Sequence, residues 1–326
     1  MYSVRTSQRI APTGTRLGLI ATTFPLLTLE ELSNEGPFEA VCSEYASRGY
    51  AGLDISLVHI LCIGKDRFAR VMQDNQLYFI GKCYSSGGGC PSAPGNSAAL
   101  KKAERTHPPI GRDVESHIAV FCAQMRELCE SLPLRSLLLS ISGQSGRDYF
   151  SQEQADKFFS TCNALGEELG VTVQHETHRH RILFNPWCTR AIVERHPTLN
   201  LLADLSHYCV VCETPCEDAD LQEAVATLIP RVTHTHARVG YEEGPQVPDP
   251  ALPAFAQHVA GHVAWWKAIF RAHISRGKAV CTVTPEFLPF PYGPVGCLRE
   301  GTQKCNDFIE KVVRTAWEEV LEDSVE

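Results

Sequence analysis

The chain has 326 residues, of which 44% are hydrophobic and 21% are charged, the composition of an ordinary globular protein with enough apolar side chains for a large core. Lys and Arg number 30 against 38 Asp and Glu, so the formal charge is −8 and no basic stripe stands out. This balance argues against a nucleic-acid backbone as partner, because phosphate contacts need clustered cations. No apolar run approaches the roughly 20 residues that cross a bilayer, so no membrane partner is expected.

The first half of the chain predicts alternating strands and helices. Strands are expected at 17–24, 51–58, 77–83 and 136–142, and helices at 38–49, 67–76, 113–132 and after the N-cap Ser151. Residues 84–96 are rich in Gly, Ser and Pro, which predicts a mobile loop over about 84–111. Its run Gly87-Gly88-Gly89 is consistent with wrapping an anion, although a plain flexible loop is the simpler interpretation.

The second half repeats the alternation. Strands are expected from Val171 and at 199–204, 231–239 and 280–284, and helices at 186–196, 220–228, 255–270 and 308–320, with a Pro-rich loop at 240–253. Regular alternation implies parallel strands, and eight such units imply closure into a (β/α)8 barrel. We therefore predict a single-domain α/β barrel over residues 16–326, preceded by a flexible tail at 1–15.

Four successive strands of the second half end in ligand-type residues. Glu176, Asp204, His236 and Glu286 each follow or close one predicted strand. In a parallel barrel the carboxyl ends of the strands lie at one face and build the active site. Three carboxylates and one imidazole form an oxygen-rich set that suits Mn²⁺, Mg²⁺ or Co²⁺, with Zn²⁺ also compatible. The sequence therefore predicts one divalent metal ion held by these four residues.

Further histidines and arginines surround the predicted ligands. His234, His236 and Arg238 share one strand face by period-two alternation, so His234 is expected one layer below His236, as a supporting residue or a substrate contact. His178 shares the face of Glu176 and is expected to touch substrate. For Arg179 and Arg181, binding of an anionic group and simple coverage of the rim are left open.

At these residues the chain resembles the xylose isomerase-like TIM-barrel superfamily, and within it the sugar phosphate isomerase/epimerase branch. The matching pieces are His-Glu176-Thr-His, Asp204-Leu-Ser-His207, His234-Thr-His236-Ala-Arg238 and Thr-Pro-Glu286-Phe. They span strands five to eight, whereas the first half agrees only in its alternation. The resemblance implies that Glu176 and Glu286 move the proton as well as binding the metal, and that His207 contacts a substrate oxygen.

Two positions depart from the pattern of the ketose epimerases. Ile182 stands where those enzymes usually carry a substrate-binding Glu, and Glu242 stands where they carry an Arg. Arg238 is the candidate to replace that Arg as a substrate-binding residue. The departures indicate a pocket that is built differently, and therefore a substrate other than a common free ketohexose.

The resulting functional hypothesis is a metal-dependent isomerase or epimerase of a sugar or sugar-like hydroxy-carbonyl compound. It transfers a proton between carboxylates through a metal-stabilised enediolate. A metal-dependent lyase or dehydratase on a similar substrate is the first alternative, and a non-catalytic sugar-binding barrel is the second. Metal-assisted phosphodiester hydrolysis is disfavoured, because neither ligands for a metal cluster on earlier strands nor a basic face is visible.

The 14 cysteines are scattered through the predicted elements without a compact framework, so we expect reduced thiols. Cys209, Cys212 and Cys216 have a spacing compatible with zinc or an iron-sulfur cluster, but no second ligand pair follows at a conventional distance. Their role is left open. A cytoplasmic protein is expected, or an organellar one if the Arg- and Ser-containing first residues act as a transit segment. Trp265 and Trp266 are consistent with a homodimer face or with packing on the barrel.

Overall fold

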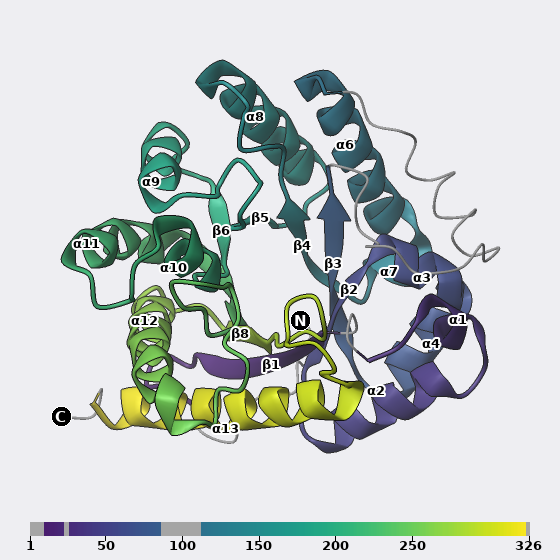
Figure 1. Cartoon of the computed structure of the whole chain (residues 1–326). Coiled ribbons are helices and arrows are strands. Elements are labelled where there is room, and N and C mark those ends of the chain that lie inside the picture. The colour runs from purple at the N-terminus through teal and green to yellow at the C-terminus, as the bar shows by residue number, and fades with distance from the viewer. Residues whose placement is uncertain (1–9, 23–25, 86–111, 324–326) are drawn as a thin grey trace. The chain divides into compact units, whose positions relative to one another are not determined.

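The computed structural model describes residues 10–22, 26–85 and 112–323 (Figure 1). Eight parallel strands form a closed barrel in the order β1-β2-β3-β4-β5-β6-β7-β8. The predicted fold class is confirmed. The strands are β1 Arg16–Thr22, β2 Gly52–Ser56, β3 Tyr78–Tyr84, β4 Leu138–Gln144, β5 Val173–Glu176, β6 Asn200–Ala203, β7 Val232–Ala237 and β8 Val280–Pro285.

Helices follow the strands along the chain. The α-helices are α1 Leu29–Ser33, α2 Pro37–Ser47, α3 Leu57–Ile63, α4 Lys65–Asp74, α6 Val114–Glu130, α7 Leu132–Arg135, α8 Gln152–Glu168, α9 Pro186–Arg195, α10 Ser206–Cys212, α11 Ala219–Leu228, α12 Ala256–Ser275 and α13 Arg299–Asp323. Two 3₁₀ turns, η1 Ile229–Arg231 and η2 Pro253–Phe255, precede β7 and α12. None of the helices in the described ranges is long and apolar enough to cross a membrane.

By their contacts the described residues group into two compact units, which divide between Ile20 and Ala21 and again between Glu176 and Thr177. In the first unit β2 to β5 pair in sequence order, and α6 lies beside α8 (Figure 1). In the second unit β6 pairs with β7, β7 with β8, and β8 with β1, while α12 packs along α13. The four predicted ligands therefore run from the last residue of the first unit through the second.

Apolar periodicity explains how the helices attach to the strands. Leu128 of α6 is fully buried. A Cβ added to Gly81 of β3 would lie only 2.7 Å from the Cδ1 methyl group of Leu128. Glycine at position 81 thus lets the helix approach the strand closely. In the second unit Phe270 of α12 packs edge-on against Trp317 of α13, with ring centroids 5.6 Å apart.

The two adjacent tryptophans of α12 are both buried, with 2% of Trp265 and 1% of Trp266 exposed. They pack inside the unit rather than on its surface. The homodimer face that these residues suggested is therefore wrong for this pair, and their alternative fate, packing on the barrel, is confirmed.

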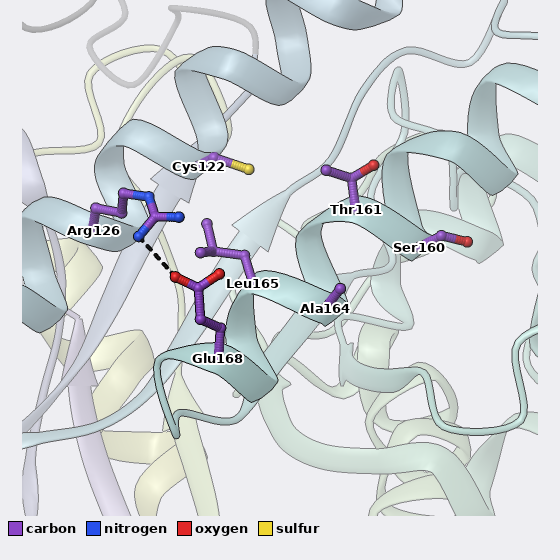
Figure 2. Close-up of a pocket in the computed structure, with 7 residues that line it drawn as sticks. All are labelled: Cys122, Arg126, Ser160, Thr161, Ala164, Leu165 and Glu168. Atoms are coloured by element: carbon purple, nitrogen blue, oxygen red, sulfur yellow. Dashed lines mark hydrogen bonds and ion pairs between the residues drawn. The ribbon is translucent and has the colours of Figure 1, made fainter.

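A surface pocket of about 540 Å³ lies between α6 and α8 (Figure 2). Cys122 and Arg126 line it from α6, and Arg126 pairs with Glu168 of α8 at 3.1 Å. It lies on the outer, helical layer of the first unit, and none of the residues that line it is a predicted site residue. We assign it no role in the site described below.

Four short helices, α1, α3, α7 and α10, were not predicted. The mobile loop expected over about 84–111 lies outside the described residues except for Tyr84 and Ser85, and so does most of the expected tail at 1–15, of which Ile10 pairs with Arg16. The Gly87–Gly89 segment is likewise outside the described ranges. The other predicted elements are present, with ends shifted by a few residues, and α13 begins earlier than expected.

Substituting Leu128 by Ala should lower the free energy of unfolding by about 2–5 kcal/mol, because a large cavity opens between α6 and β3. The matched change Leu132→Ala, at a residue that is 86% exposed, should alter it by less than about 0.5 kcal/mol. Denaturant unfolding of the two variants beside the wild type measures both values. Equal effects at the two positions would contradict the packing described here.

Candidate metal and substrate site

The four predicted ligands are all buried at strand ends. Glu176 is the last residue of β5, Asp204 directly follows β6, His236 lies in β7 and Glu286 directly follows β8. Their exposed fractions are 2%, 0%, 0% and 5%. Each offers one ligand atom, and these atoms all lie within 4.8 Å of one another. A single small cation fits such a group.

Backbone and hydroxyl contacts fix the first two ligands. Thr177 follows Glu176 directly, its N–H donates to the Leu202 carbonyl at 3.0 Å, and its hydroxyl donates to the Asp204 carbonyl at 2.9 Å. The Asp204 N–H in turn donates to the same hydroxyl at 2.9 Å. Thr177 is thereby held against the end of β6, where Asp204 follows.

The Asp204 carboxylate is held from both sides. Ser206 donates to Oδ1 through its hydroxyl at 2.5 Å and its backbone N–H at 3.2 Å. The Arg238 guanidinium donates to Oδ2 of Asp204 and, through Nε, to the Ser206 hydroxyl at 3.1 Å. Arg238 is itself only 1% exposed, so this is a buried, charge-assisted pair.

Arg238 lies against several site residues. Its Nη2 is 3.9 Å from Oε2 of Glu286, and that oxygen lies 2.8 Å from Nδ1 of His236. The guanidinium also stacks on the ring of Tyr292, 4.8 Å from its centroid. Three buried carboxylates are thus accompanied by one guanidinium, which leaves two negative charges among these four residues. A divalent cation would neutralise that excess.

The contacts of His207 indicate a neutral imidazole that carries its proton on Nδ1. Arg238 Nη2 lies 2.7 Å from His207 Nε2, and because a guanidinium only donates, Nε2 must accept and Nδ1 must carry the proton. Burial, and then the nearby charges of His178 and Arg238, hold the pKa of His207 well below its ordinary value. The buried Nδ1–H has no hydrogen-bond partner among the described residues. A substrate oxygen would satisfy it.

His178 covers His207, with ring centroids 3.9 Å apart. Its Nδ1 donates to the Arg179 carbonyl at 2.6 Å, and its Nε2 lies 3.4 Å from the Tyr292 hydroxyl. Arg179 lies over the same Tyr292 ring, 5.4 Å from the centroid. Tyr292 therefore contacts three residues that the sequence analysis singled out, although it was itself not predicted to have a role.

The two ring nitrogens of His234 contact residues of β8 and not the predicted ligands. Its Nδ1 lies 2.9 Å from the Thr282 hydroxyl and its Nε2 lies 3.1 Å from the Thr284 hydroxyl, both on β8. Its ring packs edge-on against His236, 5.4 Å between centroids. With both nitrogens engaged by β8, the geometry favours the supporting role that the sequence left open over direct substrate contact.

Two residues of the site escaped the sequence reasoning. Ser206 stood inside the Asp204 to His207 motif, but a hydroxyl two residues after a carboxylate was not recognised as its anchor. Tyr292 lies six residues beyond Glu286, past the end of any predicted element. An aromatic ring in the loop after the last ligand is a weak signal by itself, and only the fold shows that it stacks on Arg238.

Removing Arg238 should destabilise the protein strongly, because the Asp204 carboxylate would stay buried without its partner. We expect Arg238→Leu to lower the free energy of unfolding by about 3–5 kcal/mol in protein treated with a chelator. Arg190→Leu is the matched control. Arg190 pairs with Glu194 and Glu223 at the exposed surface, where such pairs contribute about 0–1 kcal/mol. A similar, small loss for both variants would contradict the buried pair.

No protein-family model and no curated protein matches the sequence. Solved structures do match the fold. A xylose isomerase-like TIM-barrel protein from Mycobacterium smegmatis, in complex with magnesium, is 12% identical over 92% of this chain and 98% of its own, with a TM-score of 0.52. The exo-beta-1,4-mannosidase Op5Man5 from Opitutaceae bacterium strain TAV5 is 13% identical over 98% of this chain and 62% of its own, with a TM-score of 0.51.

D-allulose 3-epimerase from Methylomonas sp., in complex with D-allulose, is 12% identical over 94% of this chain and 99% of its own, with a TM-score of 0.48. Identities this low concern the fold, and one fold supports many chemistries. The resemblance that the sequence indicated is confirmed at that level: the chain has the fold of the xylose isomerase-like TIM-barrel proteins.

Proposed function

We propose that the chain is a divalent-metal-dependent isomerase or epimerase that acts on a sugar or a sugar-like hydroxy-carbonyl compound. The observation that carries the proposal is the convergence of Glu176, Asp204, His236 and Glu286, four buried ligand-type side chains at four successive strand ends. Burying several carboxylates and an imidazole together costs free energy unless another group balances their charge and makes their hydrogen bonds or coordination bonds. One hard divalent cation supplies both.

The donor set fits Mn²⁺, Mg²⁺ or Co²⁺, with Zn²⁺ also compatible, because three of the four ligands are carboxylates. The three carboxylates and the guanidinium of Arg238 together carry a charge of −2, which one divalent cation would balance. The similarly folded protein from M. smegmatis is in complex with magnesium, which supports a metal site in this fold. When bound, the ion would supply Lewis acidity that stabilises negative charge on two neighbouring substrate oxygens.

In this proposal Glu176 and Glu286 transfer the proton. One carboxylate removes it from the carbon beside the carbonyl, and the other returns it from the opposite side or to the neighbouring carbon. Both side chains are almost fully buried, so water competes little for the proton. Asp204 and His236 serve as ligands only, and the bonds from Ser206 and Arg238 hold the Asp204 carboxylate in place for that role.

The substrate contacts follow from the donors that remain. The Nδ1–H of His207 is buried without a partner in the described chain, and it is the group that we expect to donate to a substrate hydroxyl or carbonyl oxygen. Arg238 reinforces this by fixing the tautomer of His207 through Nε2. His178 packs on the same imidazole and limits how the substrate approaches.

The proposed metal site predicts selective loss of Mn²⁺ binding. Purified protein freed of metal should bind about one Mn²⁺ per chain, and Asp204→Asn and Glu286→Gln should each weaken binding at least about tenfold, since each removes a charged ligand. Glu223→Gln, at an exposed position of α11, is the matched control and should bind as the wild type does. Binding is measured by electron paramagnetic resonance of free Mn²⁺. Unchanged binding in both ligand variants would refute the site.

Proton transfer predicts isotope exchange. Incubated in deuterated water with a panel of ketoses and related hydroxy ketones, the enzyme should incorporate deuterium at the carbon beside the carbonyl of its substrate. Glu176→Gln and Glu286→Gln should slow this by about 10²–10⁴, the usual contribution of a general acid or base. Exchange with loss of water would identify the lyase alternative. Binding of a sugar without any exchange would identify a sugar-binding barrel and overturn the enzymatic proposal.

A further inference from the structure

A second buried cluster of ligand-type side chains lies in the second unit, apart from the four residues discussed above. Cys209 lies in α10, Cys216 lies in the turn after it, and His262 lies in α12. At most 1% of any of these side chains is exposed. One atom from each residue falls within 4.8 Å of the others. The cysteines come from the segment whose spacing had suggested a metal, and α12 supplies the histidine that the sequence could not place.

The distances match the edges of a tetrahedral zinc site. The two sulfur atoms are 3.6 Å apart, and Cys209 Sγ is 4.0 Å from Nε2 of His262. Cys216 Sγ lies 3.2 Å from the other ring nitrogen, Nδ1. Tetrahedral Zn²⁺, with Zn–S near 2.3 Å and Zn–N near 2.0–2.1 Å, separates two sulfurs by about 3.8 Å and sulfur from nitrogen by about 3.6 Å. A disulfide would instead need the sulfurs within about 2.05 Å.

The histidine is oriented as a metal-binding imidazole usually is. Its Nδ1 lies 2.9 Å from the His258 carbonyl one turn earlier in α12, so Nδ1 carries the proton and donates to that oxygen. The lone pair then lies on Nε2. Donation from the other ring nitrogen to a backbone carbonyl is the common support of a histidine ligand. The Gly240 N–H, 3.2 Å from Nε2, is the donor that a metal ion would displace.

The two sulfur atoms lie within hydrogen-bond distance of each other, 3.6 Å apart. Two thiolates would carry a charge of −2 in a buried place, and one Zn²⁺ cancels it.

We propose that Cys209, Cys216 and His262 form a structural zinc site. The site would join α10, the turn that follows it and α12. It would also support the candidate active site from behind. His207 precedes Cys209 by two residues in α10, and Arg238 precedes Gly240 by two residues, so the cluster borders both segments that carry substrate-facing groups.

The segment that contains Gly240 approaches the start of α10 closely. An added Cβ on Gly240 would lie 2.3 Å from the Ser206 carbonyl oxygen, so only glycine permits this contact. Ser206 anchors Asp204, and the Gly240 N–H lies 3.2 Å from Nε2 of His262. A zinc ion bound by Cys209 and His262 would therefore lie beside this contact.

Cobalt substitution tests the proposal independently of any enzymatic activity. The full chain, reduced and freed of metal, is titrated with Co²⁺ and then with Zn²⁺. We expect a thiolate-to-cobalt charge-transfer band in the near ultraviolet, with the intense visible bands of tetrahedral Co²⁺, and we expect about one equivalent of Zn²⁺ to abolish both. Oxygen and nitrogen ligands do not produce the charge-transfer band, so Glu286→Gln should retain it.

Cys216→Ser and His262→Gln should each reduce the charge-transfer band by at least half, whereas Cys188→Ser, which changes an exposed thiol, should leave it intact. Three results would overturn the proposal: no band in the wild type, a band that survives unchanged in both ligand variants, or a Cys209–Cys216 disulfide in protein isolated under reducing conditions, recognised by a mass lower by two hydrogens. The wild-type titration decides the question even if the variants fail to fold.

Discussion

The buried contact between Arg238 and Asp204 is the interaction on which the candidate site depends. It brings a guanidinium into a group of carboxylates that would otherwise repel one another and resist burial. Arg238 does more than balance charge. By donating to His207 it forces the proton of that imidazole onto Nδ1, and by stacking on Tyr292 it is fixed in place itself. The guanidinium of Arg238 thus orients the Asp204 carboxylate, determines the tautomer of His207 and packs against the ring of Tyr292.

The same contact distinguishes this pocket from the one that the resemblance implied. In the ketose epimerases the corresponding Arg stands about six residues beyond the histidine ligand, where this chain has Glu242. Here the guanidinium comes from the residue directly after β7, two residues after His236, and Glu242 pairs with His258 instead.

The strand ends could be predicted from sequence because two independent patterns coincide there. Apolar runs such as those before Glu176 and Asp204 indicate buried parallel strands. Each run ends at a carboxylate, and burying a carboxylate costs free energy unless it has a partner. Short helices could not be predicted in the same way. Residues 57–63 are an apolar run that resembles a strand, and only Ser56, whose hydroxyl accepts from the His59 N–H, starts α3.

Contacts between distant segments were also beyond the sequence. His262 lies 46 residues after Cys216 in a helix whose periodicity indicated nothing but packing, so the search for a second cysteine pair missed it. The general reason is physical. Metal sites in helical layers are assembled by tertiary approach, and the approach here depends on Gly240 and Gly261, since a Cβ on Gly261 would lie 2.5 Å from the Cβ of Cys216. Two glycines admit the contact, and glycine spacing alone does not say what comes near.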